Sequence, residues 1–209
     1  MDFEQTMSAP NSDRLILLRN SMKKILKESR YQHSIGVEEV SCDLAIINGY
    51  DPVKASITGI LHDCAKNLTD EELLAECIKY HLPITEVEAI CVDLLHAKVG
   101  AIHAKEKYGV MDEDIYNAIT YHTTGRPGMS LLEKIVFIAD YIEPYRKLIP
   151  GINEIRVAAY ENLDLAVYMI TENTLKYLDQ TCSTIDTLTN ETYEYYKQLF
   201  EATRNERRL

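Results

Sequence analysis

Four histidines and two aspartates have the residue types and the order that suit a hydrolytic metal site. In chain order they are His33, His62, Asp63, His96, His122 and Asp140. Imidazole nitrogen and carboxylate oxygen together bind divalent first-row metals, and an ion held in this way usually activates water for hydrolysis. One His-Asp dipeptide is weak evidence, whereas the whole ordered series is much more specific. The series predicts a site for one or two divalent ions.

Two of these positions put polar groups into strongly apolar helical patterns. His62-Asp63 follows the apolar run 57–61, and Asp140 interrupts the apolar run 135–142. Burying a polar group without a partner costs roughly 2–7 kcal/mol, and coordination to a metal removes that cost. The alternative for Asp140 is a buried salt bridge to Arg146. Each of the other three histidines, taken alone, is more often a satisfied core residue than a ligand.

Three further residues are expected outside the ligand set. His81 lies where a helical pattern ends, which favours a helix cap or a surface position. His103 follows His96 by two helical turns, about 10.5 Å along the axis, so the two cannot easily reach one centre. Cys64 could be a soft ligand, but the more common interpretation is a small residue of the helix core.

The loop after His122 has features that suit phosphate binding. It contains two glycines, a proline, two threonine hydroxyls and Arg126, whose guanidinium can hold phosphate through two hydrogen bonds. Lys66 and Arg146 are the other cations near predicted ligands. The alternatives are a plain connection between helices for the loop and ordinary solvated charges for the two cations.

Composition and charge exclude several classes of protein. The chain has 209 residues, enough for one substantial core, and a net charge of −11, which argues against general nucleic-acid binding. No apolar run approaches the roughly 18 residues of a membrane helix, and the acidic N-terminus is not a secretory signal. The five cysteines are scattered and form no C-x-x-C pair, which favours free thiols in a reducing compartment. We therefore expect a cytoplasmic protein with no membrane or nucleic-acid partner.

Hydrophobic periodicity predicts an all-α fold, a bundle of about ten helices with no strand. Asp51-Pro52 is a typical helix start, and capping boxes begin at Thr69, Thr85 and Ser130. The later helical patterns cover 97–108, 112–121, 130–143, 153–180 with a possible break, and 189–204.

The two ends of the chain differ from the middle. Residues 1–11 lack periodicity, so we expect a flexible tail followed by a single helical domain over 12–209. Near the C-terminus, Tyr193, Tyr195 and Tyr196 could stack on a base, but such tyrosines more often dock a final amphipathic helix.

Several stretches that contain these residues resemble a known family. They are Arg-Tyr-Gln-His-Ser at 30–34, Gly-Ile-Leu-His-Asp-Cys-Ala-Lys at 59–66, Leu-His-Ala-Lys-Val-Gly-Ala at 95–101, His-Thr-Thr-Gly-Arg-Pro at 122–127 and Ile-Ala-Asp-Tyr-Ile-Glu-Pro-Tyr-Arg at 138–146. Together they resemble the HD-domain phosphohydrolase superfamily and, more narrowly, the YqeK family of bacterial symmetrical dinucleoside tetraphosphatases. The resemblance to these proteins covers about residues 12 to 180.

The resemblance implies an HD-domain helical fold and cleavage of diadenosine tetraphosphate into two ADP molecules. It also implies a centre of one or two divalent ions, with iron expected and Mn, Co, Mg or Zn as alternatives. The implied metal ligands are His33, His62, Asp63 and Asp140, with His96 and His122 completing a second position. Asp63 and Lys66 are then the catalytic residues, because Asp63 can bridge two ions and Lys66 can offset charge in the transition state.

The expected substrate contacts are groups that can meet a phosphate or that lie beside the ions. They are Arg30, His33, Lys66, His96, His122, Thr123, Thr124, Arg126, Tyr141 and Arg146. The expected partner is a dinucleoside polyphosphate or ADP, and a homodimer is left open. The guanosine tetraphosphate hydrolases of the same superfamily carry Glu-Asp after their His-Asp pair, where this chain has Lys66-Asn67-Leu68. Two alternatives remain: hydrolysis of another nucleotide, and a non-catalytic metal-bound module that senses nucleotide.

Overall fold

The computed structural model describes residues 11–147, 149–181 and 183–206. Within these ranges the chain forms eleven α-helices and one 3-10 helix and contains no strand, which confirms the predicted all-α fold. The helices are α2 (Asn11–Ile25), α3 (Glu28–Ile47), α4 (Pro52–Leu61), α5 (Asp70–Lys79), α6 (Glu86–Ile90), η1 (Val92–Leu94), α7 (Leu95–Glu106), α8 (Glu113–Thr120), α9 (Leu131–Ile142), α10 (Ile152–Glu161), α11 (Leu163–Gln180) and α12 (Thr187–Glu206). The tail expected over residues 1–11 lies outside the described residues except for Asn11, where α2 begins.

The helix starts predicted from capping residues are present. The Asp51 carboxylate accepts hydrogen bonds from the backbone N–H groups of the first turn of α4. Thr69, Thr85 and Ser130 each form a complete capping box with the glutamate three residues later. The pattern over 153–180 divides at Asn162, whose side chain caps α11. These interactions satisfy N–H groups that the first turn of a helix leaves without partners, and so they fix where each helix begins.

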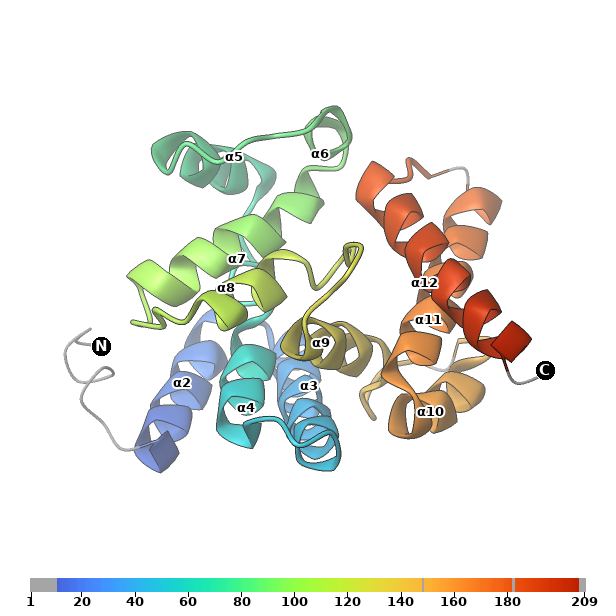
Figure 1. The fold of residues 1–209 in the computed structure, drawn as a ribbon. Coiled ribbons are helices and arrows are strands. Elements are labelled where there is room, and N and C mark those ends of the chain that lie inside the picture. The colour runs from blue at the N-terminus through green and yellow to red at the C-terminus, as the bar shows by residue number, and fades with distance from the viewer. Residues whose placement is uncertain (1–10, 148, 182, 207–209) are drawn as a thin grey trace.

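Helix α9 lies in the middle of the molecule (Figure 1), where it packs against α3, α4, α8, α10 and α11. In this view α5 to α8 lie above α9 and α10 to α12 lie to its right. The core is continuous through this centre, where Ile60, Leu61 and Ile138 have no exposed surface. Truncating a residue of this kind to alanine typically costs about 2–5 kcal/mol. None of the helices described is long and apolar enough to cross a membrane.

Gly59 allows α3 and α4 to pack with little space between their backbones. A Cβ at this position would lie 2.7 Å from the Cα of Glu38 on α3, closer than two such atoms can approach. The close packing brings His33 of α3 and His62 at the end of α4 together, with their Nε2 atoms 3.3 Å apart. A small residue in the run 57–61 thus helps to position the candidate site.

The tyrosine-rich segment docks the last helix, as the more common interpretation predicts. Tyr196 is 1% exposed, and its hydroxyl accepts a hydrogen bond from the backbone N–H of Met129 at 3.1 Å. Tyr193 stacks on Tyr168 of α11 with ring centroids 5.8 Å apart. Tyr195 remains partly exposed.

Candidate metal centre

The structure brings all six residues of the His/Asp series together at one place. They come from the second turn of α3, the ends of α4 and α8, the start of α7 and the last turn of α9. All are buried except Asp140, which is half-buried. Three groups have ligand atoms within 4.8 Å of one another: His33, His62 and Asp63; His62, His122 and Asp140; and Asp63, His96 and His122.

Each of the four histidines has its Nδ1 atom held by an acceptor. The Nδ1–H of His62 donates to the Gly59 carbonyl at 2.7 Å, and that of His122 donates to the Ile119 carbonyl at 2.7 Å. His96 makes the corresponding bond to the Asp93 carbonyl. A donating Nδ1 leaves the lone pair on Nε2, which is the form of imidazole that binds a metal. All four Nε2 atoms lie within the cluster of six His and Asp residues.

His33 is held by a carboxylate instead of a backbone carbonyl. Its Nδ1–H donates to Oε1 of Glu143 at 3.1 Å, and Glu143 is 1% exposed. Burial lowers the pKa of His33, but hydrogen bonds to Asp140 and Glu143 outweigh burial and raise it to about 9, so a metal ion that binds Nε2 would replace the proton shared with Asp140. Gly36 makes room for this contact, since a Cβ there would lie 2.7 Å from Oε2 of Glu143. Glu143 therefore fixes the ring orientation of a candidate ligand.

Asp63 lies between two pairs of histidines and turns one oxygen to each pair. Its Oδ2 is 3.3 Å from Nε2 of His62 and 3.7 Å from Nε2 of His33. Its Oδ1 is 3.2 Å from Nε2 of His96 and 3.6 Å from Nε2 of His122. Burial raises the pKa of Asp63, but the neighbouring imidazoles outweigh burial and hold that pKa well below its usual range. A carboxylate in this position can join two metal half-sites.

Asp140 completes the half-site of the first histidine pair. Its Oδ1 lies 3.0 Å from Nε2 of His33 and 3.9 Å from Nε2 of His62. Arg146 is also near, with Nη1 3.4 Å from the same oxygen and 3.0 Å from the Asp140 carbonyl. Both interpretations made for Asp140 from the sequence are therefore compatible with its surroundings.

The donor atoms present fit a divalent ion in each half-site. The Nε2 atoms of His33 and His62 are 3.3 Å apart, and those of His96 and His122 are 3.2 Å apart. Two nitrogens bound to one ion at about 2.0–2.1 Å with tetrahedral angles lie about 3.3 Å from each other. A mixed set of imidazoles and carboxylates favours borderline first-row metals over calcium, which prefers oxygen ligands alone.

Two cations contact the ligand set directly or closely. Arg30 donates from Nη1 to Oδ2 of Asp63 at 2.7 Å, and about a third of its side chain is exposed. Lys66 lies 3.4 Å from Nδ1 of His96 and forms an ion pair of 2.6 Å with the exposed Asp93. Together with Arg146 they place positive charge beside both half-sites, where it can balance an anion.

Arg126 is already paired within the protein. Its Nε and Nη2 atoms donate to the two carboxylate oxygens of Glu133 at 3.1 and 2.6 Å, and Glu133 is 1% exposed. The guanidinium also lies over the ring of Tyr121, 4.6 Å from its centroid. The edge of the guanidinium that carries Nε and Nη2 is therefore occupied by Glu133. The phosphate contact expected for Arg126 remains a prediction, and it would have to use the third nitrogen, Nη1.

The other expected substrate contacts lie near the centre without touching it. The Tyr141 hydroxyl accepts a hydrogen bond from Asn173 at 2.8 Å, and Arg146 lies over its ring. Thr123 and Thr124 line a cavity next to the centre, and Thr124 donates to the Gly125 carbonyl at 3.0 Å. Their roles toward a substrate remain predictions.

The residues expected outside the ligand set lie outside it. Nε2 of His103 is 3.0 Å from a carboxylate oxygen of Glu76, and His81 is an exposed residue with φ 55° directly after the cap of α5. Cys64 is buried, and its thiol donates to the Gly100 carbonyl at 3.4 Å. Burial raises the pKa of Cys64 to about 12, which disfavours the thiolate that a metal binds. The core interpretation of Cys64 is the better one.

Comparisons with known proteins agree with this geometry. Residues 30–145 match the HD domain family. Relatives from Halalkalibacterium halodurans and Bacillus subtilis, each named symmetrical bis(5'-nucleosyl)-tetraphosphatase, are 44% and 42% identical over 157 residues, which is 75% of this chain and 83% of each relative. A crystal structure from Clostridium acetobutylicum, described as a predicted HD superfamily hydrolase involved in NAD metabolism, is 41% identical, with a TM-score of 0.83 over 87% of this chain and 95% of that one.

Proposed function

The chain belongs to the HD domain family and, within it, to the symmetrical bis(5'-nucleosyl)-tetraphosphatases, and we propose that it hydrolyses diadenosine tetraphosphate to two ADP. In this reaction water adds to one of the two inner phosphorus atoms. The central P–O–P link breaks, and each half leaves as ADP.

The observation that carries this proposal is the position of Asp63 between two histidine pairs. One carboxylate turns an oxygen to each pair, so two cations held there would lie side by side. A divalent pair of this kind suits a substrate whose reacting centre is a chain of phosphates, because both the attacking and the leaving oxygen need stabilisation.

We propose His33, His62, Asp63, His96, His122 and Asp140 as the metal ligands, with iron as the resident ion. The four anchored imidazoles and the two carboxylates support a first-row divalent metal. Such an ion supplies Lewis-acid polarisation of a phosphoryl oxygen and makes water more acidic.

The residues around the ligands have separate tasks in this proposal. Arg30 and Arg146 lie beside the carboxylates of the first half-site, and Lys66 lies beside His96 of the second. Their charges hold phosphate oxygens on both sides of the link that breaks and offset negative charge as it grows in the transition state. The hydroxyls of Thr123 and Thr124 extend this surface toward the neighbouring cavity.

We also propose a cytoplasmic location. The four cysteines among the described residues are free thiols, as is usual in a reducing compartment, and Cys182 lies outside the described residues.

The experiment is metal and product analysis of protein purified without oxygen. We expect one or two bound divalent ions per chain and ADP as the only nucleotide product from diadenosine tetraphosphate. Reaction in oxygen-18 water should place one label in one of the two ADP molecules. Production of ATP and AMP would contradict symmetrical cleavage. Tight ADP binding without products for any of the metals named above would favour the sensing alternative.

A further inference from the structure

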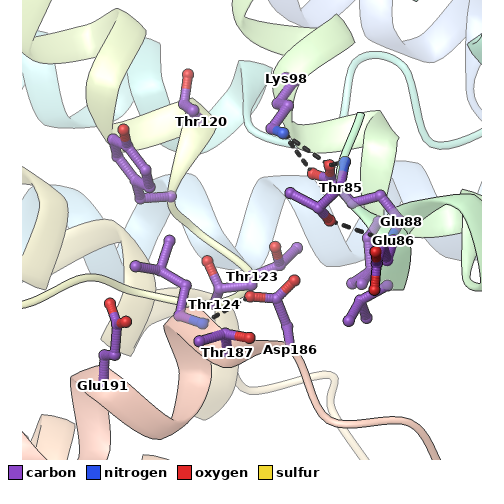
Figure 2. Close-up of a pocket in the computed structure, with 14 residues that line it drawn as sticks. Thr85, Glu86, Glu88, Lys98, Thr120, Thr123, Thr124, Asp186, Thr187 and Glu191 are labelled. Carbon is purple, nitrogen blue, oxygen red and sulfur yellow. Dashed lines mark hydrogen bonds and ion pairs between the residues drawn. The ribbon is translucent and has the colours of Figure 1, made fainter. Parts of the chain in front are cut away.

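We propose that a cavity beside the metal centre binds the uncharged nucleoside part of a nucleotide substrate. The proposal rests on the proposed function, since it assigns one end of the substrate whose phosphates lie at the centre. The cavity has a volume of about 480 Å³ and lies between α6, the start of α7, the loop after α8 and the start of α12 (Figure 2). Pockets for small organic ligands usually have volumes of about 300–1,000 Å³.

The cavity is next to the second half-site. Thr123, which lines it, directly follows His122, and Leu94, which also lines it, lies two residues before His96. A nucleotide whose phosphates lie at the half-site of these two histidines therefore has the cavity within reach of its sugar and base.

The charges around the cavity disfavour phosphate inside it. Its walls carry the carboxylates of Glu86, Glu88, Asp186 and Glu191 and one cation, Lys98. That cation is already paired, with Nζ 2.6 Å from Oε1 of Glu88. Negative charges close to each other in this way repel a polyphosphate, so the phosphates belong at the metal centre with its arginines.

The helix starts in the walls offer no anion site either. At the start of α12 the Asp186 carboxylate accepts from the backbone N–H of Leu188 at 2.8 Å, and the Asp186 carbonyl accepts from that of Thr189 at 3.1 Å. Thr85 and Glu88 close the capping box at the start of α6. Because these N–H groups already have partners within the protein, neither helix start is available to a phosphate.

The remaining surface suits a purine nucleoside. Val87, Leu94, Leu188 and the ring of Tyr121 give the cavity apolar walls, against which a flat base can lie. Glu86 and Glu191 have no ion-pair or hydrogen-bond partner for their carboxylates among the residues described. They can accept hydrogen bonds from ribose hydroxyls or an exocyclic amine, which are donors that adenosine carries and pyrophosphate lacks.

The test compares ADP with inorganic pyrophosphate, which has the same two phosphates and no nucleoside. Leu188→Trp fills the cavity from the first turn of α12. Gln198→Trp, on an exposed position of the same helix, is the matched control. Binding of both ligands to the metal-loaded proteins is measured by calorimetry, without turnover. We expect Leu188→Trp to weaken ADP binding by about tenfold or more and to change pyrophosphate binding by less than about twofold, with no effect of the control.

A second variant keeps the proposal testable if Leu188→Trp does not fold. The chain has no tryptophan, so Thr187→Trp at the exposed rim of the cavity introduces a single tryptophan, whose emission can be excited apart from that of the 14 tyrosines. ADP should change its emission, and pyrophosphate should not. Unchanged ADP binding in Leu188→Trp, equal losses for both ligands, or an equal response of Thr187→Trp to both would overturn the proposal. These results do not depend on hydrolysis, so a failure of the proposed activity would be seen separately in the product analysis.

Discussion

Glu143 accepts a hydrogen bond from Nδ1 of His33 at 3.1 Å, although the two residues are separated by 110 positions in the chain. The other oxygen of Glu143 accepts from the backbone N–H of Tyr145, and Arg156 binds the Glu143 carbonyl at 3.1 Å. The carboxylate is thus fixed at both oxygens. A fixed carboxylate behind a ligating imidazole sets the ring orientation and makes the nitrogen on the far side more basic.

We therefore expect Glu143→Gln to weaken metal binding while the fold is kept. Partners of this kind usually contribute about 10–100-fold to metal affinity, so a loss in that range is predicted, measured by competition with a chelator. Glu38→Gln is the matched control, because Glu38 is also buried, at 2% exposed, but pairs with Arg19 at 2.9 Å. The control should lower thermal stability without changing metal affinity. Equal metal affinity in the two variants would show that Glu143 has only a structural role.

The two oxygens of Asp63 lead to a prediction about metal stoichiometry. Asp63→Asn keeps the shape of the side chain but replaces one oxygen with an NH₂ group that cannot bind a metal. Because the oxygens face different histidine pairs, the neutral amide can offer an oxygen to only one of them, so we expect both half-sites to bind their ions less tightly and no detectable turnover. His96→Ala should mainly empty the second half-site. Metal analysis of the two variants is the measurement, and full occupancy with normal activity in Asp63→Asn would end the metal-site interpretation.

The histidines outside the centre provide a test of the ligand assignment. His103 pairs with Glu76, and His81 is exposed after α5, so His103→Ala and His81→Ala should keep metal content and turnover within a few-fold of the unchanged protein. His103→Ala should lower thermal stability slightly, because it removes one of the two partners of the Glu76 carboxylate and leaves only Lys79. Loss of metal in either variant would mean that the ligand set is wrong.

The sequence predicts the parts of this molecule that depend on local rules. The caps at Asp51 and Ser130 depend on residues a few positions apart, and these helix starts are found as expected. The periodic pattern predicts the start of α7 at residue 97, but the helix begins at Leu95, because η1 leads directly into it. Boundaries that depend on neighbouring turns are less visible in a periodic pattern.

The parts that the sequence does not predict depend on contacts between distant residues. Glu143 lies three residues after Asp140 in a stretch that was singled out, yet its partner His33 is on another helix. The spacing between Asp140 and Glu143, one helical turn, was the available signal, because it places the two carboxylates on adjacent turns. The cavity was also missed, since its walls come from four separate segments that only the fold brings together.

The pairing of Arg126 with Glu133 allows the effect of Arg126 on stability to be measured separately from its effect on substrate binding. Glu133 both closes the capping box of α9 and accepts two hydrogen bonds from Arg126. Arg126→Ala leaves this buried carboxylate without its cation, and we expect a loss of about 1–3 kcal/mol in the free energy of unfolding, measured by urea denaturation. Adding Glu133→Gln should recover most of that loss, because glutamine can still complete a capping box.

Replacing Arg30 should lower activity more than it lowers stability. Its guanidinium lies beside Asp63 and is about one-third exposed, so Arg30→Ala removes positive charge from the place where the phosphates are proposed to bind. We expect kcat/KM to fall by about 10–100-fold, which corresponds to the roughly 1.5–3 kcal/mol of a hydrogen bond to a charged group.

The comparison with Arg126→Ala/Glu133→Gln decides the role of Arg126. If this stable double variant binds pyrophosphate less tightly than the unchanged protein, Arg126 contacts phosphate through Nη1. If it binds pyrophosphate normally, the pairing with Glu133 is the whole function of Arg126.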